Sequence, residues 1–144
     1  MRVRREKDVL FVVFEKGEKI SESMMKLIED PRVEETGVIL TALGMIKNVE
    51  IGYGLYDGET VKYENSFFSG PFELLGFSGF ILKGEEKPYH IHVYLGNRDK
   101  KAVGGHLIDG EVHTFIEMAI LVSNARIKRE ISDGLPLLNL CRNF

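Results

Sequence analysis

The pattern of apolar and polar positions along the chain predicts several strands and one helix. A short apolar run at 8–14 is typical of a buried strand. Residues 19–30 carry apolar side chains at helical spacing, and Pro31 ends the predicted helix because it lacks a backbone N–H. Further strands are predicted at 35–42, 46–56, 60–68, 72–83, 88–95, 111–123 and 125–130.

Turn-forming residues mark where these segments are expected to end or to change direction. Gly44 is expected to interrupt the apolar pattern, Asp57-Gly58 is a hairpin signal, and Asp109-Gly110 is expected to form another turn. Gly76 and Gly79 lie inside a strand pattern, where glycine indicates a bulge or the close approach of another backbone. The pattern therefore favours hairpins between neighbouring strands.

The C-terminal part of the pattern has two interpretations. Residues 111–123 fit a helix or a strand, and turn signals on both sides favour a strand with 125–130 as its partner. The apolar segment 135–140 is expected to pack back onto the domain. The sum is an α+β fold in a single domain, with one main helix packed on a bent, mostly antiparallel sheet. The expected division is a basic N-terminal arm at 1–7 and a folded domain at 8–144.

Charge is distributed unevenly between these two parts. The chain has a net charge of −3, of which the segment 1–7 contributes +3, so the remaining 137 residues carry −6. A domain with that balance is a poor binder of phosphate backbones. Any contact with nucleic acid is therefore expected to be weak and to use the basic residues of the arm, namely Arg2, Arg4, Arg5 and Lys7.

The sequence predicts a cytoplasmic protein that is not a membrane protein. No apolar run approaches the roughly 18 residues of a membrane helix, and the N-terminus lacks the apolar core of a secretory signal. The single cysteine, Cys141, excludes an internal disulfide and is expected to be a buried structural thiol.

Three of the four histidines, His90, His92 and His106, predict a metal centre. In a strand, residues two apart point to the same face about 6.6 Å apart, so His90 and His92 are expected to face one point. The pair Gly104-Gly105 is expected to bend the chain sharply and to bring His106 beside them. Neutral imidazole is the commonest metal-ligating side chain, and zinc is the expected metal because the motif holds no thiolate or carboxylate.

Several of these residues have a second interpretation. The three histidines also fit a packed, hydrogen-bonded cleft without metal. Glu73 lies in an apolar strand and fits either a catalytic carboxylate that orients a histidine or takes a proton, or an ion pair at a subunit edge; Glu117 has the same two interpretations. His113 is expected at the surface. A basic loop fits either a solvated turn or a holder for an anionic ligand near the metal; it contains Arg98, Lys100 and Lys101.

Four short motifs follow one another in an order and spacing that resemble a known family. They are Leu55-Tyr56-Asp57-Gly58 with Tyr63, Gly70-Pro71-Phe72-Glu73-Leu74-Leu75-Gly76-Phe77-Ser78-Gly79, His90-Ile91-His92-Val93 and Gly104-Gly105-His106-Leu107. Together they resemble the PPC (plants and prokaryotes conserved) domain over about 8–140. Each motif alone is weak evidence for the family, whereas four motifs in this order and spacing are specific for it.

The resemblance implies an α+β fold with a seven- to eight-stranded sheet that assembles as a homotrimer. In plants the domain follows AT-hook motifs, which are Arg-Gly-Arg-Pro segments that enter the minor groove of A·T-rich DNA, and it mediates self-association and contact with transcription factors. Stand-alone prokaryotic members are often described as DNA-binding by analogy. This chain has no Arg-Gly-Arg-Pro segment, because Arg2-Val3-Arg4-Arg5 lacks the glycine and the proline.

Two functions are compatible with these features. The first is a homotrimeric module that binds a metal or a small anionic ligand, with a DNA-linked regulatory role implied by the family. The second is a zinc-dependent enzyme of the hydrolase type that uses the open position of a three-histidine centre. The sequence contains no clear nucleophile–base pair and no phosphate-binding glycine loop, which favours the module.

Overall fold

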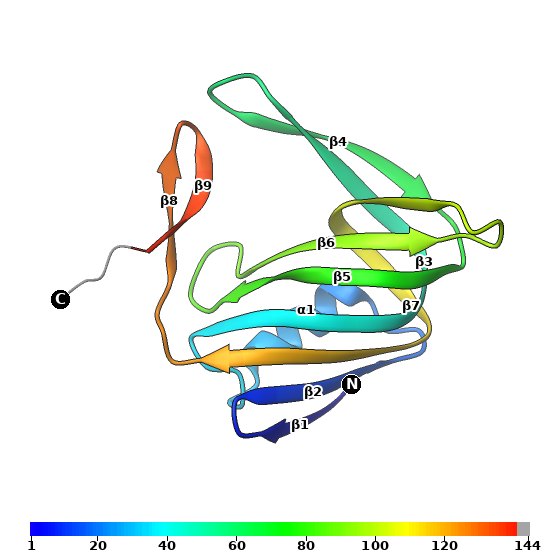
Figure 1. The fold of residues 1–144 in the computed structure, drawn as a ribbon, viewed down its shortest axis with the longest axis horizontal. Coiled ribbons are helices and arrows are strands. Elements are labelled where there is room, and N and C mark those ends of the chain that lie inside the picture. The colour runs from blue at the N-terminus through cyan, green and yellow to red at the C-terminus, as the bar shows by residue number, and fades with distance from the viewer. Residues whose placement is uncertain (141–144) are drawn as a thin grey trace.

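The computed structural model describes residues 1–140, in which nine strands and one helix are found (Figure 1). The predicted structural role of Cys141 lies outside the described residues. The elements are β1 (Arg2–Glu6), β2 (Val9–Glu15), α1 (Ile20–Glu29), β3 (Thr36–Tyr56), β4 (Val61–Phe68), β5 (Phe72–Leu82), β6 (Tyr89–Gly96), β7 (Ala102–Ser123), β8 (Lys128–Ser132) and β9 (Leu135–Asn139).

The main sheet is antiparallel and has seven strands in the order β1-β2-β7-β6-β5-β3-β4. An additional pairing between β7 and β3 closes a ring of strands, β3-β7-β6-β5, within this order. Because every member of the ring has two neighbours, the sheet must bend, as Figure 1 shows for β3 and β7. This architecture confirms the predicted α+β fold with one helix on a bent antiparallel sheet.

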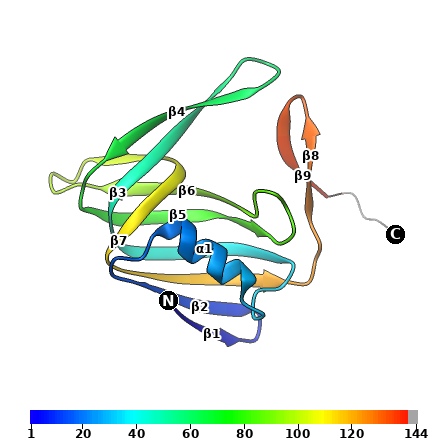
Figure 2. The same cartoon turned by 180° about the vertical axis from the view of Figure 1, so that it is seen from behind.

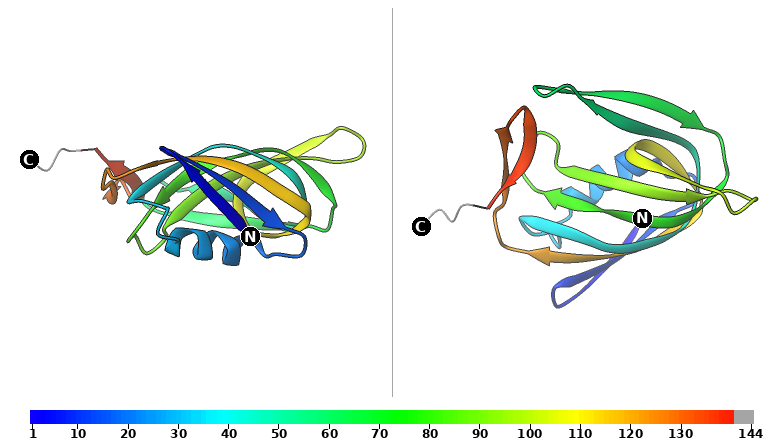
Figure 3. Two further views of the ribbon diagram at one scale, coloured as in Figure 1. Left: turned by 90° about the horizontal axis from the view of Figure 1, so that it is seen from below. Right: turned by 45° about the horizontal axis from the view of Figure 1, so that its top comes forward.

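Helix α1 covers one face of the sheet, as the view from behind and the view from below show (Figures 2 and 3). It matches the predicted helix to within one residue at each end, and Pro31 comes directly after its C-cap residue, Asp30. Its apolar stripe, with Ile20, Met24 and Leu27, is almost completely buried against the sheet. The other face of the sheet, here called the outer face, has no helix on it.

Gly44 does not end a strand, contrary to the prediction of two strands around it. It lies inside the continuous strand β3, where its φ is +146° and the pairing register shifts. A β-carbon at this position would overlap the backbone carbonyl of Phe115 on β7. Glycine is required here because two bent strands approach each other closely. Gly44, which was expected to break a strand, therefore marks the place where β3 lies close against β7.

The predicted sharp bend at Gly104-Gly105 is also wrong. Strand β7 runs through both glycines and through Asp109-Gly110, which was expected to be a turn. A β-carbon at Gly104 would overlap the carbonyl oxygen of Val93 on β6, and one at Gly105 would press against Ile51 on β3. The glycines therefore allow β6 and β3 to lie close to β7, and they do not turn the chain.

Other glycine signals are confirmed. Asp57-Gly58 lies in the hairpin between β3 and β4, where the Asp57 carboxylate accepts the backbone N–H of Thr60 at 2.7 Å. The β5–β6 register shifts next to Gly76, as expected for a bulge. A β-carbon at Gly79 would overlap the carbonyl of the neighbouring strand, as expected for a close approach.

The C-terminal prediction is partly wrong. Strand β7 pairs with β2 and β3, and the segment after it does not return along it. Instead, β8 pairs with β9 as a separate two-stranded sheet that stands beside the end of the main sheet (Figure 1). Its turn contacts the β3–β4 hairpin, since Tyr56 Oη donates to the carbonyl of Asp133 at 2.7 Å.

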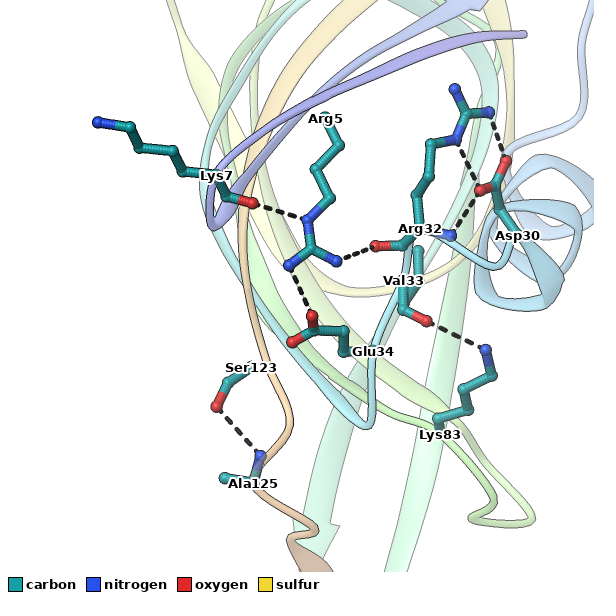
Figure 4. A network of polar contacts seen from close by, with 9 residues as sticks. All are labelled: Arg5, Lys7, Asp30, Arg32, Val33, Glu34, Lys83, Ser123 and Ala125. Carbon is teal, nitrogen blue, oxygen red and sulfur yellow. Dashed lines mark hydrogen bonds and ion pairs between the residues drawn. The ribbon is translucent and has the colours of Figure 1, made fainter.

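The basic segment 1–7 is built into the sheet, because β1 pairs with β2 along its whole length. Polar contacts fix its C-terminal end to the loop after α1 (Figure 4). Arg5 binds the Glu34 carboxylate at 2.6 Å, while Arg32 donates to the carbonyl of Val3 and binds Asp30. The loop from α1 to β3 is thus held to β1 through Arg5 and Arg32.

Candidate metal centre

Because side chains alternate between the two faces of a strand, His90 and His92 on β6 point to the same face of the sheet. Ile91 and Val93, which alternate with them, are almost completely buried in the core, so the two imidazoles must point away from it. His106 on β7 is the direct cross-strand partner of His92. Directly paired residues share a face of the sheet, and the third imidazole therefore lies beside the other two.

The three rings converge on one point. His90 Nε2 and His92 Nε2 are 3.1 Å apart, and each of the three histidines offers a nitrogen within 4.8 Å of the others. Two nitrogens that share a tetrahedral metal with bonds of about 2.0 Å are themselves about 3.3 Å apart. Among residues 1–140, His106 Nδ1 is buried without a hydrogen-bond partner, an orphaned nitrogen that a ligand would satisfy. The donor set therefore fits a metal such as zinc.

Tyr63 on β4 covers His106, with ring centroids 4.7 Å apart and planes inclined by 30°. Its ring lies where a side chain at Gly52 would be, because a β-carbon there would come within 2.9 Å of it. Gly52 is the cross-strand neighbour of His106 on β3. No local signal in the sequence indicates that Tyr63 lies at the site, since its position depends on the pairing of β3 with both β4 and β7.

The surroundings keep two of the rings neutral. Burial, followed by the charges of His106, His92 and Arg129, lowers the pKa of His90 from its ordinary 6.5 to about 4. Burial also lowers the pKa of His106, with smaller contributions from the charges of His92 and Lys87. At pH 7 both rings are therefore neutral, which is the form that binds metals.

The structure does not bring Glu73 to the histidines. Glu73 is exposed and pairs with Gly96, four residues along β6 from His92, which corresponds to about 13 Å. Glu117 is exposed on β7, far along the strand from His106. The basic loop lies between β6 and β7, beyond Gly96, and so away from the histidine cluster; it contains Arg98, Lys100 and Lys101.

His113, which was expected at the surface, is half-buried on β7 and does not belong to the cluster. Its Nδ1 is a second buried nitrogen without a hydrogen-bond partner among the described residues. It is therefore a histidine of the same strand that lies outside the cluster.

Two of the four basic residues expected to contact nucleic acid are engaged within the chain. Arg2 lies 3.1 Å from the carboxylate of Glu15, and Arg5 forms the ion pair with Glu34. Arg4 and Lys7 are exposed, and no ion pair is found for either in the described part of the chain. The free positive charge of the N-terminal segment is therefore smaller than its composition indicates.

Comparison with known structures shows the fold in other organisms. A plant- and prokaryote-conserved (PPC) protein of Pyrococcus horikoshii is 26% identical, with a TM-score of 0.78 and coverage of 98% of this chain and 95% of that one. The metal-containing protein AF0104 of Archaeoglobus fulgidus is 27% identical, with a TM-score of 0.74 and coverage of 94% of both chains. A protein of Bacteroides thetaiotaomicron described as a candidate DNA-binding protein is 20% identical, with a TM-score of 0.80 and coverage of 96% of both.

No curated protein matches the chain. The family model of the Plants and Prokaryotes Conserved (PCC) domain, however, matches residues 1–124. This match covers β1 to β7, including all three histidines of the cluster, and agrees with the resemblance that the four sequence motifs predicted. The chain therefore belongs to the Plants and Prokaryotes Conserved domain family.

Proposed function

We propose that this protein is a metal-binding module whose centre is formed by His90, His92 and His106. The convergence of the three rings carries the proposal, because their nitrogens lie within 4.8 Å of one another and two of them are spaced as ligands of one ion would be. The neutral state of His90 and His106 supports it. The similar archaeal protein that is described as metal-containing is consistent with it.

Zinc is the proposed metal, since three nitrogen ligands with an open fourth position suit a tetrahedral ion. When bound, such an ion would act as a Lewis acid toward whatever occupies the fourth position. The module is favoured over the hydrolase, because no carboxylate of residues 1–140 joins the histidines within 4.8 Å and Glu73 lies at the other end of its strand. We propose the cytoplasm as the location; among the described residues, no helix is long and apolar enough to cross a membrane.

Replacing His92 with Ala should lower zinc affinity by about 100-fold or more, because it removes one of three ligands. His92 is exposed, so the variant should keep its fold. Zinc binding is measured by titration calorimetry after treatment with a chelator, and folding by circular dichroism. The matched control is His113→Ala, which removes a histidine outside the cluster and should leave the affinity unchanged. Equal zinc affinity of wild type and His92→Ala would refute the proposed ligand set.

The stability of the metal-free protein should depend on pH through His90. This ring titrates near 6.5 in the unfolded chain and near 4 in the folded one, so between these values only the unfolded state binds the proton. The free energy of unfolding should therefore fall as the pH is lowered from 6.5 to about 4. Screening limits the contribution of His90, a half-buried residue, to about 1–2 kcal/mol.

The measurement compares urea unfolding of metal-free wild type and His90→Gln at pH 7 and pH 4.5. Glutamine does not titrate, so the variant should lose about 1–2 kcal/mol less than wild type over this interval. Other titrating groups are common to both proteins and cancel in the comparison. An identical loss in both proteins would show that His90 is not held neutral by the fold.

We further propose that the protein is a homotrimer that associates through the outer face. This face carries large apolar side chains that no element of the chain covers, among them Phe11 at 53% and Leu43 at 52% exposure. They line a shallow groove of about 490 Å³ across β1, β2, β3 and β7. Contiguous exposed apolar surface of this kind marks an interface, and closure around a symmetry axis would cover it.

Leu43→Glu should convert the trimer into monomers, because it places a charge in the middle of this face. Molar mass is measured by size-exclusion chromatography with light scattering at micromolar concentration. Met25→Glu is the matched control, since Met25 is similarly exposed, at 42%, but lies on helix α1 on the opposite face. A wild-type protein that is monomeric, or a Leu43→Glu variant that stays trimeric, would contradict the proposed interface.

For DNA we propose weak binding that does not depend on sequence. The net charge is −3, and Arg2 and Arg5 are already paired with carboxylates. At physiological salt we expect a Kd of about 10⁻⁴ M or weaker, equal for A·T-rich and G·C-rich duplexes and weaker still at higher salt. Fluorescence anisotropy at several salt concentrations measures this, with Arg4→Ala plus Lys7→Ala as the variant and Lys16→Ala as control. Nanomolar binding to one duplex alone would refute the expectation.

A further inference from the structure

Tyr63 contacts the histidine cluster but is not one of its proposed ligands. Its ring lies over His106, with centroids 4.7 Å apart and planes inclined by 30°. The rings of His90 and His92 lie beside His106 as well, at centroid distances of 4.8 and 5.6 Å. Of these three neighbours, Tyr63 is therefore the one whose role the proposed ligand set leaves unexplained.

The contact between Tyr63 and His106 spans the width of strand β3. Tyr63 on β4 pairs with Gly54 of β3, and His106 on β7 pairs with Gly52 of β3. Neighbouring strands lie about 4.8 Å apart, so β4 and β7 are separated by about 10 Å. A side chain on this face of β3 would stand between the two rings. Glycine at both positions leaves the space that the tyrosine ring occupies.

Tyr63 packs closely on these two glycines. A β-carbon at Gly52 would come within 2.9 Å of Cδ1 of the tyrosine, and one at Gly54 within 3.5 Å of its Cε1. Asn65, two residues later on β4, donates from Nδ2 to the Glu50 carboxylate at 2.9 Å and ties β4 to β3 beside the ring. Tyr63 itself is 47% exposed, so it lies at the surface and outside the hydrophobic core.

His106 has no hydrogen bond that would fix the orientation of its ring. In the described part of the chain, neither of its ring nitrogens has a hydrogen-bond partner, and Nδ1 is buried. Metal-binding histidines usually donate their second ring N–H to a carboxylate or a carbonyl, which fixes the angle of the imidazole. The angle of the His106 ring therefore depends on the rings that pack against it.

We propose that Tyr63 is a positioning residue of the histidine centre, which holds the His106 imidazole at the angle required for a shared metal ion. The proposal rests on the metal centre proposed above and adds a residue that acts through one of its ligands. His90 and His92 share strand β6, whereas His106 comes from β7, so rotation of its ring alone would move a nitrogen away from the common point. A packed aromatic ring opposes this rotation, because aromatic pairs favour particular ring geometries.

The first test measures zinc affinity by titration calorimetry on the full chain, after a chelator has removed bound metal. Tyr63→Ala should bind zinc about tenfold more weakly than wild type, as expected when a residue that orients a metal ligand is lost. Tyr63→Phe keeps the ring and should bind zinc as tightly as wild type does. Tyr53→Ala is the matched control, because Tyr53 is 70% exposed, follows Gly52 on β3 and points to the opposite face.

A second variant moves the ring without deleting it. Gly52→Ala places a methyl group against Tyr63 and should displace its ring from His106, which again weakens zinc binding. The visible spectrum of bound Co²⁺ reports how the ligands are arranged. At saturation it should differ from wild type in Tyr63→Ala and Gly52→Ala and be unchanged in Tyr63→Phe. A merely structural role of Tyr63 would lower the free energy of urea unfolding and leave this spectrum unchanged.

The outcomes separate this proposal from the metal centre itself. If wild type binds zinc and Tyr63→Ala binds it equally tightly with the same Co²⁺ spectrum, the positioning role is refuted and the metal centre stands. A loss in Tyr63→Phe or in Tyr53→Ala as large as that in Tyr63→Ala would also refute it, because ring packing would not be the cause. If wild type binds neither zinc nor Co²⁺, both proposals are refuted. Circular dichroism checks the fold of each variant, and Gly52→Ala decides the question if Tyr63→Ala does not fold.

Discussion

The close approach of β6 and β3 to β7 is the constraint on which the histidine centre depends. Gly104 and Gly105 permit it, because a β-carbon at either position would collide with a neighbouring strand. The same contact pairs His92 with His106 and sets the spacing of the three rings. The geometry of the site is therefore a consequence of backbone packing, and it exists before any ligand arrives.

Electrostatics explains why a shared cation would suit this arrangement. Three imidazoles that are close together and partly buried cannot all be protonated at moderate pH, because burial and mutual repulsion disfavour their charged forms. The pKa values of His90 and His106 are lowered for this reason. An orphaned nitrogen on His106 adds a second penalty. A cation shared by the three rings would relieve both penalties.

The two faces of the sheet have separate roles. Helix α1 closes the core on one face, while the outer face presents apolar side chains that no element of the described chain covers. Cross-strand pairs connect this outer face to the histidines, since Leu121 pairs with Val38, Val38 with Phe80, and Phe80 with His90. The histidine cluster thus lies on the continuation of the proposed trimer face, and association of subunits would alter its access to solvent.

Local patterns in the sequence determined the helix, most strands, and the fact that His90 and His92 share a face, because these depend on periods of 3.6 and 2 residues. They also indicated the close approach at Gly79. Only the tertiary structure decided what Gly44 and Gly104-Gly105 do, since a glycine that permits a crossing and one that permits a turn look alike in sequence. Long-range pairing likewise placed Tyr63 beside His106 and Glu73 away from the histidines, because strand partners depend on contacts between residues distant along the chain.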